Sequence, residues 1–386
     1  MPPRDRSGAT LAAFYFCWLA AVGTFGPFLA AYLGARGFSP RAAAWTLAAL
    51  PLIRVIVTPG WTYVADLLRA PALTLRVVAL GSLGAFLALR GTSTPAALTL
   101  ALLAYTAFRA PVGALSDSVA LAWAARTGGS FGSVRAWGSA GYLAASFTVA
   151  STLDRLGHGP ALTLTTTLLA LGTLSAWAMP AAAPRPSASL WPSFRRMLAT
   201  PAVRRVLAAG VLQQVGLAPY EGLFAAWMLP RAGGLWTGVA IASGVACEIA
   251  VMVWGRPWLA RVGPRRALQV AFAASVVRWL VTALAPWTAV VALAQTLHAL
   301  AFGLYFVASV EAVDRAAPDD VRSSAQGVHY TVAFGVGAAL SLALAGSLGG
   351  VSAMRAIFLL AAVASALAGW VVTGLGPLPP GRLGAR

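Results

Sequence analysis

The sequence predicts an all-α polytopic membrane protein, with twelve transmembrane helices arranged as two pseudo-symmetric six-helix bundles. Three observations support this fold class. The 386 residues are 59% hydrophobic and only 10% charged, whereas a soluble domain carries about 25% charged residues. The apolar residues gather in stretches close to the ~20 residues that a helix needs to cross a bilayer. Six such stretches lie on each side of a segment rich in proline and arginine.

Each predicted span is an apolar stretch bounded by loops that carry arginine, proline or glycine. The first stretch is too long for the core of a signal peptide, so we expect a retained first helix. In the seventh, Pro219 and Gly222 flank Glu221, and a helix can break there and expose backbone to a cavity. The predicted spans are residues 9–33, 42–65, 72–89, 95–121, 134–155, 160–181, 205–229, 236–255, 266–285, 287–311, 324–346 and 353–375.

The longest polar stretch divides the chain into two halves. We predict an N-terminal bundle at 1–181, a cytoplasmic linker at 182–204 and a C-terminal bundle with a short basic tail at 205–386. An internal repeat supports the division, because Gly60 and Gly255 are 195 positions apart, as are Gly132 and Gly327. Paired halves with a substrate site at their interface are a common plan for secondary transporters.

The net charge of +18 raises the question of nucleic-acid binding, but its distribution favours membrane topology. With both termini placed in the cytoplasm, most arginines fall in cytoplasmic loops, as in the linker, and few fall in external loops. This is the positive-inside pattern. The absence of lysine indicates GC-rich bacterial coding. We therefore expect a multi-pass protein of a bacterial cytoplasmic (inner) membrane, in contact with lipid and with no nucleic-acid partner.

Several ionisable residues fall inside predicted spans, where each unpaired charge costs about 2.5–3.5 kcal/mol on the insertion scale. Such residues usually face the bundle interior and have partners. The two in the second and fourth spans could instead pin helices together or extend toward the interface. The set is Arg54, Arg109, Asp117, Glu221, Glu248, Arg278 and His298.

The loop after the second span resembles the signature loop of the major facilitator superfamily. Gly60, Ala65, Asp66 and Arg69 fit its pattern, whereas the second copy lacks the acid. The resemblance implies that Gly60, Asp66 and Arg69 form a conformational latch. The alternative is a basic anchor that only sets topology.

Four further segments resemble the branch of lactose permease, phenylpropionate permease and nucleoside symporters. They are residues 111–118, residues 131–142, Glu248 with residues 255–263, and residues 278–279 with residues 297–304. The resemblance implies that Asp117 and Arg135 hydrogen-bond the substrate and that Tyr142 stacks on it, with Trp137 and Tyr220 in the same site. In the alternative interpretation, Asp117 forms a helix-end salt bridge and Arg135 only sets topology.

The same resemblance assigns proton coupling to Glu248, Arg278 and His298, with Glu221 as a further carboxylate. A carboxylate near an arginine and a histidine can exchange a proton as its surroundings change. The sequence departs from lactose permease at Ala301, where that protein has a second glutamate one turn after its histidine. Glu248 or Glu221 would therefore have to carry the proton.

These observations predict a secondary active transporter and not an enzyme. We expect proton-coupled symport of a small polar organic solute (a sugar or oligosaccharide, a nucleoside or an aromatic acid) by alternating access in a monomer. A proton gradient would drive it without a cofactor: a phosphate loop needs a lysine, and His158, His298 and His329 are too far apart to form a metal motif. The alternatives are a proton-driven exporter of lipophilic compounds, which 14 tryptophans would suit, and a non-transporting membrane sensor.

Overall fold

The computed structural model describes residues 7–179, 190–254, 256–317, 322–376 and 378. Some features predicted above lie outside these ranges: the last two residues of the sixth span (180–181), the start of the linker (182–189), Gly255 of the repeat, and the basic tail after residue 378. All regular secondary structure in the described ranges is helical. The predicted all-α class is therefore confirmed.

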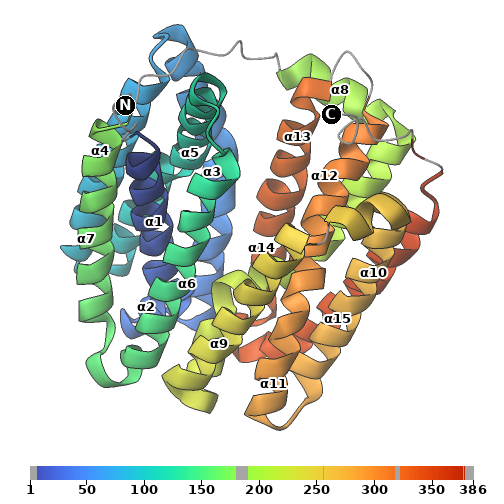
Figure 1. Cartoon of the computed structure of the whole chain (residues 1–386). Helices are drawn as coiled ribbons and strands as arrows, with labels where there is room; N and C mark the ends of the chain where they lie inside the picture. The colour runs from blue at the N-terminus through green and yellow to red at the C-terminus, as the bar shows by residue number, and fades with distance from the viewer. Residues whose placement is uncertain (1–6, 180–189, 255, 318–321, 377, 379–386) are drawn as a thin grey trace. The chain divides into compact units, whose positions relative to one another are not determined.

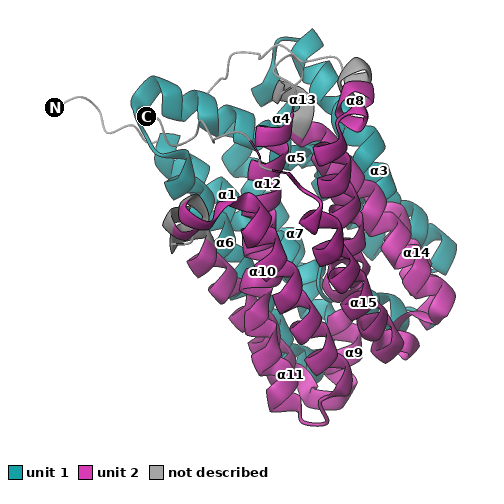
Figure 2. Ribbon diagram, turned by 90° about the vertical axis from the view of Figure 1, so that its right-hand side faces the viewer, with its two compact units in different colours: residues 1–39, 52–187 teal, residues 40–51, 188–386 magenta. Residues whose placement is uncertain are grey.

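The chain forms two compact units, which Figure 2 shows in teal and magenta. Unit 1 comprises residues 1–39 and 52–187, and unit 2 comprises residues 40–51 and 188–386. The start of α3 thus belongs to unit 2, although the rest of that helix belongs to unit 1. The predicted domain bounds stay a prediction, and the described part of the predicted linker contains a helix.

In unit 1, α1 packs against α6 and α7, and α4 packs against α5 and α7. Proline begins three helices of the first half, where its missing N–H is no loss. The helices of this half, labelled in Figure 1, are α1 (Ser7–Phe25), α2 (Leu29–Ala35), α3 (Pro40–Leu67), α4 (Pro71–Arg90), α5 (Pro95–Thr127), α6 (Phe131–Leu156) and α7 (His158–Trp177).

In unit 2, α9 and α10 both pack against α15, and α9 also contacts two wide helical turns, η2 and η4. The elements are α8 (Leu190–Ala199), α9 (Pro201–Trp254), α10 (Arg256–Leu284), α11 (Thr288–Ala294), η1 (Gln295–Leu297), η2 (Ala299–Leu304), α12 (Tyr305–Ala316), α13 (Arg322–His329), η4 (Tyr330–Gly337), α14 (Ala338–Leu348), η5 (Gly350–Ala353) and α15 (Met354–Thr373).

Nine helical stretches of the described residues are long and apolar enough to cross a membrane. One of them, Pro201–Val251, has 51 residues and is two helices joined at Gly233, whose φ of 72° and ψ of 172° are not helical. Two more helices, α6 and α7, have 26 and 20 residues. With the long stretch counted as two helices and α6 and α7 added, the described residues contain twelve long helical segments, which follow one another along the chain as the predicted spans do.

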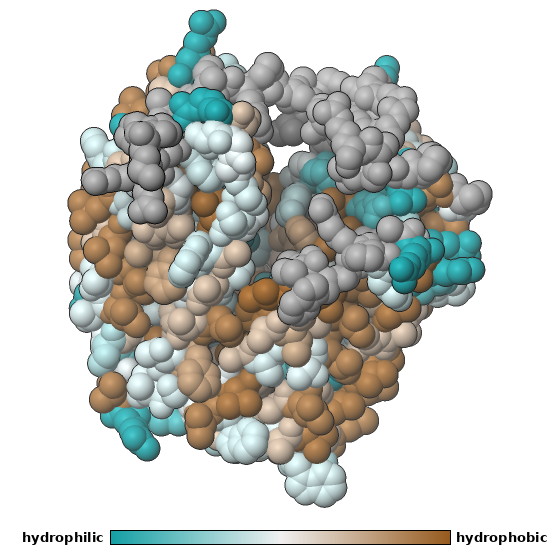
Figure 3. Space-filling view, in the orientation of Figure 1, coloured by the Kyte–Doolittle hydropathy of each residue, from teal (hydrophilic) through white to brown (hydrophobic). Residues whose placement is uncertain are grey.

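Large hydrophobic side chains are exposed on these helices, and on the face shown in Figure 3 the aliphatic residues appear brown. Trp370, Ile56 and Leu293 are 72%, 70% and 68% exposed. In water, such extensive exposed apolar surface would be costly or would mark an interaction site. Surrounded by lipid, it is the ordinary outer surface of a membrane protein.

The structure corrects the predicted helix breaks. The first span is interrupted, because α1 ends at Phe25 and α2 begins at Leu29. Gly26 and Pro27 occupy the gap, and proline has no N–H to continue the helix. The seventh span does not break at Pro219, because α9 continues through it and changes direction only at Gly233. At Gly233 the positive φ is accessible to a residue without a Cβ.

The tenth and eleventh spans each contain wide π-helical turns. In the tenth, the 3₁₀ turn η1 precedes His298 and the π-helical segment η2 follows it. In the eleventh, η4 forms the second π-helical segment. Such turns leave carbonyl groups without the usual helical donor and are frequent at functional sites.

Glycines allow α1 and α6 to approach closely in unit 1. A Cβ on Gly141 would lie 2.3 Å from the carbonyl oxygen of Phe16, and one on Gly23 would lie 2.6 Å from that of Tyr142. Backbones can approach this closely only where a side chain is absent. This contact holds Tyr15 of α1 beside Arg135 of α6.

Candidate functional site

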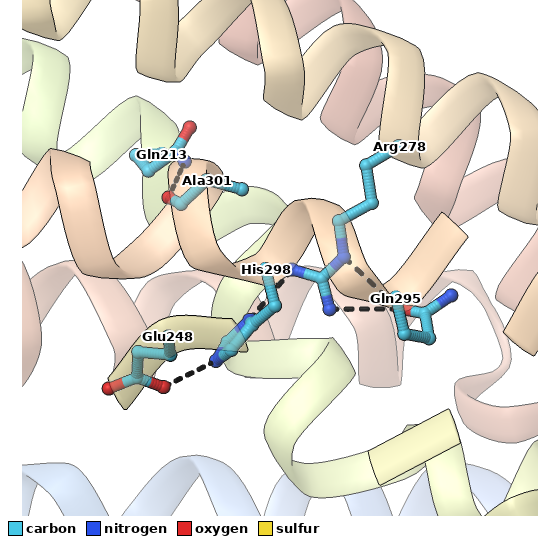
Figure 4. A network of polar contacts seen from close by, with 6 residues as sticks. All are labelled: Gln213, Glu248, Arg278, Gln295, His298 and Ala301. Carbon is cyan, nitrogen blue, oxygen red and sulfur yellow. Dashed lines mark hydrogen bonds and ion pairs between the residues drawn. The ribbon is translucent and has the colours of Figure 1, made fainter. Parts of the chain in front are cut away.

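Unit 2 contains a connected chain of buried and half-buried polar groups drawn from α9, α10 and the tenth span (Figure 4). Glu248 Oε2 lies 3.2 Å from His298 Nε2. His298 Nδ1 lies 2.9 Å from Arg278 Nη1. Arg278 and Gln295 are fully buried, and His298 is 6% exposed. The structure therefore brings together three of the predicted proton-coupling residues: Glu248 contacts His298, and His298 contacts Arg278.

Local backbone geometry brings these groups together. Gln295 and His298 are three residues apart at a 3₁₀ turn, and residues at that spacing lie on the same side of a 3₁₀ helix. Gly244 lets α9 approach this turn, because a Cβ there would lie 3.0 Å from the carbonyl oxygen of Gln295. Glu248, one helical turn after Gly244, then reaches the imidazole.

The Arg278 guanidinium is enclosed by aromatic rings and an amide. Its Cζ lies 4.1 Å from the ring centroid of Tyr220 and 4.3 Å from that of Trp279. Its Nε and Nη2 donate to Gln295 Oε1 at 3.1 and 2.9 Å. Ring faces attract cations most strongly where water is excluded. The aromatic face of Tyr220, predicted to be in the substrate site, is thus occupied by Arg278.

The contact between Arg278 and His298 defines the imidazole tautomer. An arginine can only donate hydrogen bonds, so Nδ1 of His298 must accept with its lone pair. In the neutral ring the proton is then on Nε2, and Nε2–H donates to the Glu248 carboxylate. A doubly protonated ring would place an N–H against the guanidinium N–H.

Glu221 is the fourth residue predicted for proton coupling, and it lies on the exposed side of α9. It interacts electrostatically with Arg278 and Tyr220, as Glu248 also does. Both carboxylates therefore attract the same buried cation. Glu248 also contacts His298, which in turn contacts Arg278.

Ala301 is fully buried, and its carbonyl oxygen accepts a 2.7 Å hydrogen bond from Gln213 Nε2. The same amide nitrogen donates to Ser275, and its oxygen accepts from Ser365. Gln213 thus supplies a donor to a carbonyl of the π-helical segment (Figure 4). The position that carries a second acid in lactose permease is here a packed backbone contact.

Unit 1 contains a smaller polar group around Tyr15. This buried tyrosine donates a 2.6 Å hydrogen bond to Asp117 Oδ1, and its ring lies 5.6 Å from Arg135 Cζ. In the described part of the chain, Asp117 and Arg135 make no direct ion pair. Tyr15 bridges the two residues, and their side chains are both half-buried.

The two aromatic residues predicted for the substrate site on α6 differ in exposure. Trp137 is 55% exposed and contacts Phe16 edge to face at 6.5 Å between ring centroids. Tyr142 is half-buried and lies where α6 crosses Gly23. Arg109, also predicted to be intramembrane, lies over the ring of Tyr105 at 5.9 Å.

The predicted latch residues lie along the end of α3. Arg69 has a φ of 49°, and its N–H donates to the Asp66 carbonyl while that of Ala70 donates to the Ala65 carbonyl, both at 3.0 Å. This is the Schellman pattern of a helix C-terminus, in which glycine is usual at the left-handed position. An arginine there carries backbone strain.

Sequence reasoning missed Tyr15, Gln213 and Gln295. The signal available for the two glutamines was a polar side chain in an apolar stretch, with Gln295 three residues before a predicted site histidine. No sequence signal pointed to Tyr15, because it is 102 positions from its partner. Among the described residues, no group of three metal-binding side chains is present.

A helical multi-pass chain with an internal histidine–carboxylate–arginine cluster has the features of a membrane transporter. The sequence matches the MFS_1 like family over residues 9–360, and the chain belongs to that family. It is therefore a multi-pass membrane protein of the major facilitator type.

Similar proteins are transporters of chemically different solutes. The chain is 29% identical to a maltose permease of Geobacillus stearothermophilus over 335 residues, covering 84% of this chain and 83% of that protein. It is 26% identical to a probable 3-phenylpropionic acid transporter of Escherichia coli (strain K12) over 354 residues, covering 89% and 91%. The crystal structure of the nucleoside transporter NupG matches with a TM-score of 0.83 at 16% identity, covering 95% and 98%, which shows a shared fold.

Proposed function

We propose that this protein is a proton-coupled symporter that imports a small polar organic solute by alternating access. The observation that carries the proposal is the buried connection from Glu248 through His298 to Arg278. A carboxylate that contacts a neutral imidazole can take up and release a proton as access to it changes. The names of the relatives favour a sugar, an aromatic acid or a nucleoside as the solute.

The substrate residues in this proposal come from the Tyr15 group of unit 1. Asp117 and Arg135 bind polar groups of the solute, and Trp137 and Tyr142 provide aromatic surface on α6. A guanidinium binds a carboxylate or adjacent hydroxyls in fork geometry. Tyr220 contributes from unit 2 by holding Arg278 in place. Gly60, Asp66 and Arg69 act as the latch between conformations.

The proposed setting is a bacterial inner membrane with both termini in the cytoplasm. The protein acts as a monomer in lipid, without a bound cofactor, and the proton gradient supplies the energy. The excess of arginine in the predicted cytoplasmic loops supports this orientation. Cysteine-accessibility labelling of single-cysteine variants in the first and last loops tests it.

Reconstitution in proteoliposomes tests the proposed function. Vesicles with an imposed inward proton gradient are supplied with labelled maltose, 3-phenylpropionic acid or uridine. We expect gradient-dependent accumulation of one solute class, its loss in Glu248→Gln, and no effect of Arg90→Gln, an exposed arginine of unit 1. Uptake that continues in the combined Asp117→Asn, Glu248→Gln, His298→Gln variant would refute the mechanism. Protection against lipophilic toxins, without uptake of any of the solutes, would instead indicate export.

A further inference from the structure

Gln295 is the best-connected polar side chain of the buried cluster in unit 2. It is fully buried, and its oxygen accepts two hydrogen bonds from Arg278. Its nitrogen donates to Thr282 Oγ1 at 3.1 Å and to the Val291 carbonyl at 2.8 Å. The side-chain oxygen thus accepts two hydrogen bonds and the side-chain nitrogen donates two, which is all that an amide can make. Exchanging the oxygen and the nitrogen would break all four, so the amide has one orientation.

This amide determines where the guanidinium points. With Nε and Nη2 held by a single oxygen, the remaining Nη1 is directed at His298 Nδ1. Tyr220 and Trp279 cover the guanidinium, which removes other orientations. Within the described residues, no carboxylate lies within ion-pair distance of Arg278. The arginine is therefore positioned by a neutral amide.

The position of Arg278 in turn restricts protonation of His298. A second proton on the imidazole would have to occupy Nδ1, where the guanidinium N–H already points. A proton can instead bind Glu248, because a protonated carboxyl keeps one oxygen able to accept from Nε2–H. Among the described residues, Arg278 from α10 acts on His298, the ring of Tyr220 from α9 contacts the imidazole, and Tyr220 and Glu221 from α9 act on Arg278.

We propose that Gln295 is a positioning residue that holds His298 in its neutral Nε2–H form, so that Glu248 is the group that takes up the coupled proton. The inference rests on the proposed proton-coupled symport. In the step, a proton from water binds a carboxylate oxygen of Glu248 on one side of the membrane and leaves from the same oxygen on the other. Arg278 and His298 keep their contact during both events.

The tautomer is directly measurable because the chain has only three histidines. The protein is labelled with ¹⁵N-imidazole histidine, and His298 is assigned with His158→Gln and His329→Gln variants. We expect the wild-type signal to remain that of a neutral ring protonated on Nε2 between about pH 5 and pH 8, where an ordinary histidine titrates. In Gln295→Met, we expect a doubly protonated ring in that range.

Two variants separate positioning from general stability. Gln213→Met removes another buried glutamine of unit 2, which binds Ser275 and Ala301 but not Arg278, and should leave the His298 spectrum unchanged. Gln295→Glu keeps an oxygen for Arg278 and should restore the Nε2–H form. If Gln295→Met fails to fold, Gln295→Asn serves as the test, because its shorter side chain withdraws the amide oxygen from Arg278 and should therefore give the doubly protonated ring. An unchanged spectrum in Gln295→Met, or the same change in Gln213→Met, would overturn the inference.

Transport assays distinguish this inference from the proposed function. In Gln295→Met, we expect gradient-driven accumulation to fall about tenfold, which corresponds to ~1.4 kcal/mol, while solute exchange without a gradient falls less than about threefold. Equal losses in the two assays would contradict a role in coupling. If the wild-type protein moves no solute, the proposed symport is refuted, and the His298 spectrum still decides whether Gln295 sets the tautomer.

Discussion

Replacing Arg278 with methionine should destabilise the protein strongly and in a way that depends on Glu248. Methionine keeps much of the apolar volume but removes three hydrogen bonds, two to Gln295 and one to His298. Removing one partner of a fully buried charged network costs about 3–5 kcal/mol, because the remaining groups stay buried without partners. We expect a loss of that size in the free energy of unfolding.

The dependence on Glu248 is measured with a double-mutant cycle of Arg278→Met and Glu248→Gln. Glu248 attracts Arg278 through His298, but its side chain is 16% exposed, and water weakens part of that attraction. We therefore expect the double variant to be more stable than the sum of the single losses by about 1 kcal/mol. The measurement is made near pH 8, where an ordinary histidine is mostly neutral.

The assay is equilibrium unfolding of the detergent-solubilised protein by sodium dodecyl sulfate, followed by tryptophan fluorescence. Arg90→Met is the matched control, because Arg90 is exposed and its hydrogen bonds within the described ranges go to Thr163 and Thr166. It should change the free energy of unfolding by less than ~0.5 kcal/mol. A loss that small for Arg278→Met, or additivity within ~0.3 kcal/mol in the cycle, would refute the reasoning.

Three further predictions concern packing and local geometry. Gly141→Ala should lower the free energy of unfolding by about 1–3 kcal/mol, since its Cβ would clash with a backbone carbonyl, whereas Gly113→Ala, with open space around it, should not lower it in the same titration. Arg69→Gly should stabilise the fold by about 1 kcal/mol, because glycine adopts the positive φ of this position without strain. The same variant should slow transport, because it removes a latch side chain, and faster or unchanged transport would contradict the latch. Tyr15→Phe should weaken solute binding about tenfold or more, because it removes a charge-assisted hydrogen bond to Asp117 worth ~1.5–3 kcal/mol. Unaltered affinity by isothermal titration would contradict a role of Tyr15 in the substrate site.

The sequence was sufficient for the fold class and for half of the unit 2 site. Burying a charge in a bilayer is so unfavourable that Arg278, His298 and Glu248 were identified from composition and position alone. Their grouping into one cluster was expected from the resemblance to lactose permease, and the structure places them in contact. The helical segments were also predictable, because a bilayer requires long apolar helices.

The sequence did not predict the exact course of the helices. Pro219 continues a helix although its residue type favours a break, and Gly233 interrupts one instead. Neighbouring helices decide whether the lost hydrogen bond of a proline is tolerated. The 3₁₀ and π-helical turns of the tenth span also depend on such packing, and no local sequence pattern predicts them.

By itself, the sequence determined that this chain lies in a membrane, how its helices follow one another, and which charged residues needed partners. Only the tertiary structure decided that a neutral amide, Gln295, positions Arg278, and that Tyr15 joins Asp117 to Arg135. The reason is physical. The penalty for burying a charge is a property of one residue, whereas a hydrogen bond of defined direction exists only after distant backbones have been brought within 3 Å or so of each other.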